Sequence, residues 1–266
     1  MSAIVFAARE YDIVIAADKR LGLAVNWNGA EVDPLDFVDG CPKLVRLRDD
    51  MILGFGSGGT GDAHAIMRER AFLEYLSGES MDGAAEMLRD RVTPDDGKGW
   101  LHCYLIGFDA GKPVAIHVGG PQHTINRNDI RHQFSSVGME EWTDRLYGLA
   151  LKLGQIVTDE ETGKPQRTYQ PEVHPHIFIR PEHMSLAGVA DAVLFTLRAG
   201  AKYLSLCHDE KQEAPALARI GQSADLIVMS NMMGQSRFNV FHIGETLGLD
   251  FGMHELVSEL TKQDQG

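Results

Sequence analysis

Serine at position 2 has the most distinctive chemical setting in this sequence of 266 residues. Removal of Met1 would make Ser2 the N-terminal residue, so that a hydroxyl and a free α-amine would belong to the same residue. An α-amine has a pKa of about 7.7–8 in model peptides. It can therefore accept the hydroxyl proton while the oxygen attacks a carbonyl carbon. Ser2 is a candidate N-terminal nucleophile.

Such a nucleophile works best beside a lysine and a carboxylate. A lysine ammonium lowers the pKa of the α-amine by like-charge repulsion, and a carboxylate orients the lysine. Asp18 follows one apolar segment and Lys43 begins another, and they are the candidates for these two roles. Arg20, two residues beyond Asp18, is an accessory candidate.

The glycine-rich stretch at residues 56–62, Gly-Ser-Gly-Gly-Thr-Gly-Asp, offers a site for negative charge. It precedes a predicted helix, so its backbone N–H groups would lie at the positive end of that helix and could stabilise an oxyanion. Gly58 or Gly59 would donate to it. The stretch lacks the Gly-Lys-Ser/Thr ending of a phosphate-binding loop, which argues against nucleotide binding.

A hairpin at the start of the chain would position Ser2. Apolar residues at 3–8 and 13–17 flank the polar break Arg-Glu-Tyr-Asp at 9–12, a pattern typical of two antiparallel strands. The numbers of facing residues in such a hairpin sum to a constant, here about 20 to 22. Ser2 is therefore expected to face residues 18–20.

The remaining elements follow from apolar periodicity. Residues 43–47 and 51–56 form a second predicted hairpin. The expected helices cover apolar stripes at 63–76, 81–92, 146–157, 186–197 and 253–260, and the expected strands are 101–108, 114–118, 133–137, 225–230 and 238–243. Ser185 is the expected N-cap of the helix that begins at Leu186. Hairpins alternating with helix pairs predict an α+β fold in which two antiparallel sheets pack together with helices outside.

Composition and charge limit the domain organisation and the partners. The chain shows no internal repeat or break in composition, so we expect a single domain over 1–266 with long loops at 21–42 and 158–181. A net charge of −13 would repel nucleic acid. No apolar run reaches the roughly 20 residues of a membrane span, and no basic leader precedes the first apolar segment. We expect a cytoplasmic protein with no membrane or nucleic-acid partner.

Cysteine and histidine usage gives no sign of a cofactor. Cys41, Cys103 and Cys207 have neither C-x-x-C spacing nor an even number, as is typical of a reducing compartment. His174-Pro175-His176 is the closest histidine pair, and no carboxylate or cysteine stands at a ligand-like spacing from it. We expect no metal and no other cofactor.

Four segments resemble the opening half of proteasome β-subunits and their bacterial HslV-type relatives. They are SAIVF at 2–6, IVIAADKR at 13–20, KLVRL at 43–47 and GSGGTGD at 56–62. The resemblance implies a four-layer αββα sandwich and an N-terminal nucleophile hydrolase, with Ser2 in the place of the catalytic threonine of this threonine-type peptidase family. It also implies Asp18 and Lys43 as the charge pair, Gly58 as the oxyanion-hole amide, and assembly into homo-oligomers.

Two later segments depart from the family pattern. Met139 stands where an accessory serine is expected. The family's Asp-x-x-Ser-Gly-Gly element is not recognisable, and Asp209 is the candidate for its aspartate, displaced by an insertion.

The leading hypothesis is a proteasome-like protease that hydrolyses peptides or unfolded protein in an oligomeric or ring-shaped assembly, with an ATPase unfoldase as a further partner. One alternative is a catalytically inactive proteasome-like structural subunit. Retention of Met1 would favour it, because a blocked α-amine cannot act as a base. A second alternative is a small-molecule amidase of the same fold, expected if the subunits do not enclose a chamber.

Overall fold

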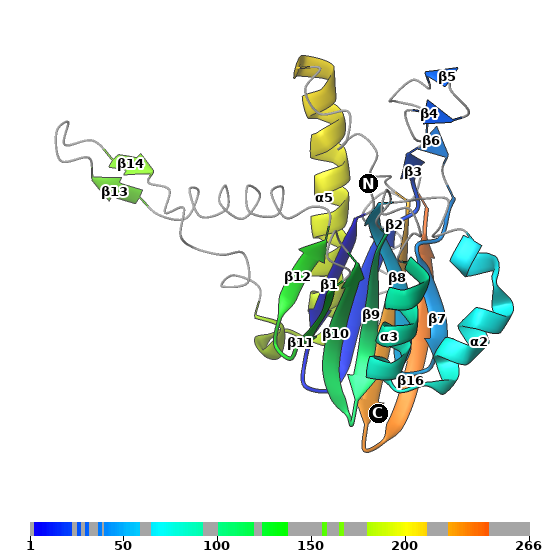
Figure 1. The fold of residues 1–266 in the computed structure, drawn as a ribbon. Helices are drawn as coiled ribbons and strands as arrows, with labels where there is room; N and C mark the ends of the chain where they lie inside the picture. The colour runs from blue at the N-terminus through cyan, green and yellow to red at the C-terminus, as the bar shows by residue number, and fades with distance from the viewer. Residues whose placement is uncertain are drawn as a thin grey trace.

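Two five-stranded antiparallel sheets form the centre of the protein (Figure 1). The computed structural model describes residues 3–22, 26–27, 30–31, 37–38, 40–58, 65–92, 101–119, 124–137, 156–158, 165–167, 180–211 and 223–244, with side chains at 3–20, 40–56, 65–92, 101–119, 124–137, 180–198 and 223–244. No helix in these ranges is long and apolar enough to span a membrane.

The first sheet contains the predicted N-terminal hairpin. Its strands, in the order β12-β1-β2-β15-β16, are β12 (Phe134–Val137), β1 (Ile4–Ala8), β2 (Asp12–Asp18), β15 (Ala224–Met232) and β16 (Gln235–Ile243). Ile4 faces Ala17 and Ala8 faces Ile13, so the pairing has the predicted register. β2 lies between β1 and β15, and this places Asp18 opposite Ala224.

The second sheet contains the other predicted hairpins. Its strands, in the order β11-β10-β9-β8-β7, are β11 (Thr124–Asp129), β10 (Lys112–Gly119), β9 (Leu101–Asp109), β8 (Met51–Gly58) and β7 (Leu44–Arg48). Ala110 and Gly111 connect β9 to β10 with positive φ angles of 47° and 78°, the conformation of a tight hairpin turn. Strand β11 was not predicted, because its largely exposed residues TINRND lack an apolar alternation.

Helices cover the outer face of each sheet. The helices are α2 (Arg70–Gly78), α3 (Met81–Val92) and α5 (Leu186–Lys211), and the turn η2 (Pro181–His183) precedes α5. Helix α3 has the predicted bounds. Residues 65–68 are also helical but Glu69 separates them from α2, so the single helix expected at 63–76 is interrupted. The Gly188 N–H donates to Ser185 Oγ at 3.1 Å, which confirms the predicted N-cap of α5.

Short strands occupy parts of the two expected loops. Within 21–42 the structure pairs β3 (Leu21–Gly22) with β6 (Phe37–Val38) and β4 (Asn26–Trp27) with β5 (Ala30–Glu31). β13 (Ile156–Thr158) pairs with β14 (Pro165–Arg167). The helix predicted at 146–157 is therefore wrong at Ile156 and Val157, where the β-branched run Ile-Val-Thr favours a strand. The rest of that stripe, and the helix expected at 253–260, lie outside the described residues.

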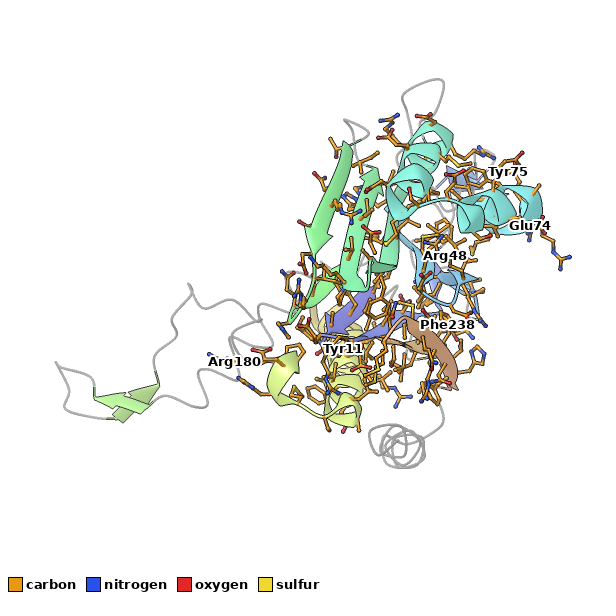
Figure 2. The ribbon with its side chains drawn as sticks, turned by 90° about the horizontal axis from the view of Figure 1, so that it is seen from below. Tyr11, Arg48, Glu74, Tyr75, Arg180 and Phe238 are labelled. Atoms are coloured by element: carbon orange, nitrogen blue, oxygen red, sulfur yellow. The ribbon has the colours of Figure 1, made fainter. Side chains whose placement is uncertain are left out.

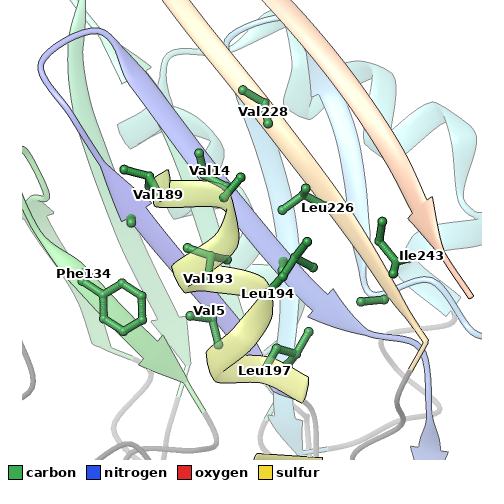
Figure 3. Close-up of a cluster of buried hydrophobic side chains, with 14 of the residues drawn as sticks. Val5, Val14, Phe134, Val189, Val193, Leu194, Leu197, Leu226, Val228 and Ile243 are labelled. Carbon is green, nitrogen blue, oxygen red and sulfur yellow. The ribbon is translucent and has the colours of Figure 1, made fainter. Parts of the chain in front are cut away.

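Alternation along the strands divides the apolar side chains among three clusters. Ile4 and Phe6 of β1 pack between the two sheets, whereas Val5 and its neighbours on the opposite face pack against Val193 and Leu197 of α5 (Figure 3). A third cluster joins α2 and α3 to the second sheet. The described residues thus form the predicted α+β fold with two antiparallel sheets, and an apolar cluster lies between them.

Polar contacts join the edges of these layers. The Arg46 guanidinium of β7 lies 4.6 Å from the ring centre of Phe238 on β16, so the two edge strands meet at one side of the sandwich. Arg48 Nη1 donates to the backbone oxygens of Ser77, at 3.2 Å, and Glu79, at 2.5 Å. Figure 2 shows Arg48 reaching from the sheet toward the α2 segment that carries Glu74 and Tyr75.

The close approach of backbone at Gly107 gives a test of this packing. A Cβ on Gly107 would lie 2.1 Å from the backbone oxygen of Asp50, whereas a Cβ on Gly78 would meet nothing within 4 Å. Gly107→Ala is expected to lower the free energy of unfolding by about 1–3 kcal/mol, the usual cost of overpacking. Urea unfolding followed by circular dichroism measures it, with Gly78→Ala as the control. Equal stability of the two variants would contradict the β8–β9 packing.

Candidate active site

Several chain segments with candidate residues meet at one end of the sandwich. Ala3 immediately precedes β1, Asp18 ends β2, and Lys43 immediately precedes β7. Gly58 ends β8 and faces Leu101 at the start of β9. Four strands therefore bring candidate residues to this end of the sandwich.

The carboxylate of Asp18 is the centre of the site. Its Oδ1 accepts a hydrogen bond from Lys43 Nζ at 2.6 Å and another from the Ala3 N–H at 2.9 Å. Its Oδ2 accepts from the backbone N–H of Arg20 at 3.1 Å. The side chains of Asp18 and Lys43 are only 0% and 4% exposed. A buried charge needs such partners, because losing its hydration is costly.

Burial and charge act on Lys43 in opposite directions. Desolvation by burial lowers the pKa of the Lys43 ammonium, and the Asp18 carboxylate opposes this effect. Cys41 raises the pKa of Lys43 to a smaller extent, and Arg20 lowers it. A lysine with a lowered pKa holds its proton less tightly than an exposed one, yet here the ion pair keeps the ammonium beside the carboxylate.

The candidate residues differ in how the structure places them. Asp18 and Lys43 are brought into direct contact although 25 positions separate them in the chain. Arg20 contributes its backbone N–H to the same carboxylate. Ser2 and Gly59, together with Met139, lie outside the described residues. Asp209 lies in α5, in a part of that helix whose side chains are not described.

A second buried carboxylate, on the strand next to β2, was missed by the sequence analysis. Asp225 of β15 is 5% exposed. Its Oδ1 is 3.2 Å from Lys19 Nζ and 2.5 Å from Nδ1 of His242 on β16. The signal was an aspartate placed within the apolar run Ala-Asp-Leu-Ile-Val-Met at 224–229, where a charge must find a partner.

The described residues contain no group of three or more histidine, cysteine, aspartate or glutamate side chains arranged to hold a metal ion. His174 and His176, the pair considered in the sequence, lie outside them. The described hydrogen bonds of the site join the Asp18 carboxylate to the Lys43 ammonium and to the backbone N–H groups of Ala3 and Arg20.

Comparisons with known proteins identify the fold. No protein-family model and no curated protein matches the sequence. The structure is similar to that of an Anbu mutant from Hyphomicrobium sp. strain MC1, with a TM-score of 0.55 and 14% sequence identity over 99% of this chain and 94% of that chain. Anbu is a proteasome-like protein related to the N-terminal nucleophile hydrolases. At this identity the likeness establishes a shared fold: the chain has a proteasome-like fold.

Breaking the buried ion pair tests its contribution to stability. Lys43→Met leaves the Asp18 carboxylate buried without its ammonium and is expected to lower the free energy of unfolding by about 3–5 kcal/mol. Lys112→Met, at an exposed position on β10, is the control and should change it by less than about 0.5 kcal/mol.

A double-mutant cycle separates the pair from general damage. Asp18→Asn combined with Lys43→Met removes both charges and should cost less than the sum of the two single changes, because neither charge is left unpaired. Urea unfolding near neutral pH measures all four proteins. Strictly additive losses would show that the two groups do not interact.

Proposed function

We propose that the protein is a proteasome-like peptidase that uses Ser2 as an N-terminal nucleophile after Met1 is removed. The observation that carries the proposal is the double role of Asp18. One carboxylate binds the buried Lys43 ammonium and also holds the backbone N–H of Ala3. Ala3 is the residue directly bonded to Ser2.

Covalent geometry supports a nucleophile at this position. Consecutive Cα atoms are about 3.8 Å apart across a trans peptide bond. Because Ala3 is anchored on Asp18, this spacing supports a proposed nucleophile one residue earlier in the chain, near the same ion pair. The α-amine of a processed Ser2 would lie near the Lys43 ammonium, whose charge lowers the pKa of the amine and keeps part of it neutral near pH 7.

The reaction follows from these groups. The α-amine takes the proton of Ser2 Oγ as the oxygen attacks the peptide carbonyl carbon, and the N–H of Gly58 or Gly59 stabilises the oxyanion. The resulting ammonium gives its proton to the leaving amine, and the C–N bond breaks to leave an ester on Ser2. The α-amine then takes a proton from water, whose oxygen attacks the ester. Cleavage of the ester returns the proton to Oγ and releases the acid.

The wider proposal concerns assembly and location. Helices on the outer faces of both sheets and the likeness to Anbu support a four-layer αββα arrangement for the whole chain and a homo-oligomer of its copies. A closed chamber would admit peptides or unfolded protein, and an ATPase unfoldase would deliver them. Free thiols at Cys41 and Cys103 are compatible with the cytoplasm.

Replacement of the nucleophile is the direct test. Ser2→Ala is expected to reduce hydrolysis of fluorogenic peptides by at least about a thousandfold while leaving the oligomeric state, measured by light scattering, unchanged. Ser77→Ala is the control, since this hydroxyl only donates to the backbone oxygen of Glu74 in α2. Unchanged turnover by Ser2→Ala would reject the assignment.

Intact-mass spectrometry of the purified chain tests the free N-terminus. The expected mass is that of residues 2–266, because the mechanism requires the α-amine of Ser2. A mass that includes Met1, together with absent peptidase activity, would instead favour a catalytically inactive structural subunit. Activity on small amides by a monomer or dimer would favour an amidase of the same fold.

A further inference from the structure

Two histidines on neighbouring strands form a contact that the proposed reaction does not use. His102 Nδ1 of β9 lies 2.8 Å from His117 Nε2 of β10. The ring planes differ by only 4°, and the ring centres are 5.0 Å apart. The two rings therefore lie edge to edge in nearly one plane. Their planes are almost parallel, and their centres are much farther apart than the two facing nitrogens. Because the lone pair of an imidazole nitrogen lies in the ring plane, the geometry suits an N–H···N hydrogen bond.

The pair lies at the same end of the second sheet as the candidate active site. His102 follows Leu101, which faces Gly58 at the end of β8. Gly56 of β8, which has no side chain, leaves room for His102 and Tyr104. A Cβ on Gly56 would lie 2.9 Å from Tyr104 Cε2 and 3.3 Å from His102 Cβ. The pair is therefore packed into the sheet rather than held on a mobile surface.

The neighbours of the pair on adjacent strands carry no charge. His117 faces Tyr104 on β9, with ring centres 4.7 Å apart, and Asn126 on β11. On β8 the position beside His102 is Gly56, which has no side chain. Across the sandwich, the described inward-facing residues of β1 are apolar. No carboxylate in the described part of the chain contributes to the pKa of His117, which burial lowers first and the charge of His102 lowers further.

We propose that His102 and His117 form a shared-proton site that binds one additional proton and excludes a second. In the neutral pair, one facing nitrogen carries the hydrogen and the other accepts it. The first added proton converts one ring to imidazolium, and the N–H···N bond persists. A second added proton would put a hydrogen on both facing nitrogens, so the rings would have to separate. This exclusion depends only on the two facing nitrogens, whatever else His102 contacts.

The consequence is a fold that is sensitive to acid at the end of β9 and β10. In the unfolded chain each histidine titrates near pH 6.5, at about its ordinary pKa. A folded-state pKa below that value means that the folded protein binds fewer protons than the unfolded one. The stability that comes from this difference is therefore present above about pH 6.5 and is lost as the pH falls below that value. For each excluded proton, the folding equilibrium constant falls by up to about tenfold per pH unit.

A matched pair of glutamine variants tests the site. His117→Gln keeps an amide group in reach of His102 Nδ1 but removes one titrating ring. Below pH 6.5 the folding equilibrium constant of this variant should therefore fall less steeply than that of the wild type, and the difference should be up to about tenfold per pH unit. His183→Gln replaces an exposed histidine in η2 and should retain the wild-type steepness. Urea unfolding at a series of pH values measures both. Equal steepness of His117→Gln and the wild type would overturn the proposal.

A measurement on the unaltered protein remains decisive if His117→Gln does not fold. The rate of hydrogen–deuterium exchange at the imidazole C2 position, followed by mass spectrometry as a function of pH, reports the titration of each histidine in any oligomeric state. We expect His117, whose pKa is lowered by burial and by the charge of His102, to titrate well below the ordinary histidine value of about 6.5. Titration of His117 with an ordinary midpoint near 6.5 would overturn the proposal.

Discussion

The arrangement of the candidate site depends on one buried ion pair. The Asp18 carboxylate and the Lys43 ammonium are both withdrawn from water, and each would be costly to bury alone. Their 2.6 Å contact, together with the N–H groups of Ala3 and Arg20, satisfies the carboxylate. Because Ala3 precedes β1, Asp18 ends β2 and Lys43 precedes β7, the same interaction fixes the relative positions of three strands. The chemistry proposed for Ser2 depends on that placement.

The meeting of the two sheets at this end requires small residues. Gly54 of β8 has no side chain, and a Cβ there would lie 3.0 Å from Ile4 Cδ1 and 3.3 Å from Leu44 Cδ2. The apolar side chains of β1 and β7 therefore approach the second sheet closely, directly beside the residues that hold Asp18 and Lys43. Packing between the sheets and the polar network at their end thus restrain the same segments, which is a requirement for a preorganised catalytic site.

The proteasome-like fold and the proposed activity rest on different observations. The likeness to Anbu covers nearly the whole chain at 14% identity, so it concerns the path of the backbone. Activity depends on particular atoms, because a fold can persist after its chemistry is lost. Asp18 and Lys43 are buried and in direct contact, which is the arrangement that the proposed nucleophile at position 2 would need. Replacing a buried ion pair by apolar side chains often leaves a protein equally stable. The burial of a charged pair at this position is therefore consistent with a functional role.

Local patterns in the sequence determined much of the framework. The apolar runs of β1, β2, β9, β10 and β15, the apolar residues that recur along β16, and the helical period of α3 were sufficient to locate these elements. Strand β11 and the strand at Val157 were not predicted. The exposed residues of β11 carry no apolar signal, and a β-branched residue at the end of a helical stripe fits either state.

Contacts between distant residues were decided by tertiary structure. The sequence suggested that Asp18 and Lys43 belong together, but only the packing of β2 against the start of β7 shows their contact and their burial. The Lys19–Asp225–His242 cluster and the His102–His117 pair were not foreseen. Both depend on which residues face each other across neighbouring strands, and strand order and register are properties of the assembled sheets. The sequence alone thus determined which side chains are available for chemistry, whereas their distances and hydration were set only when the strands packed together.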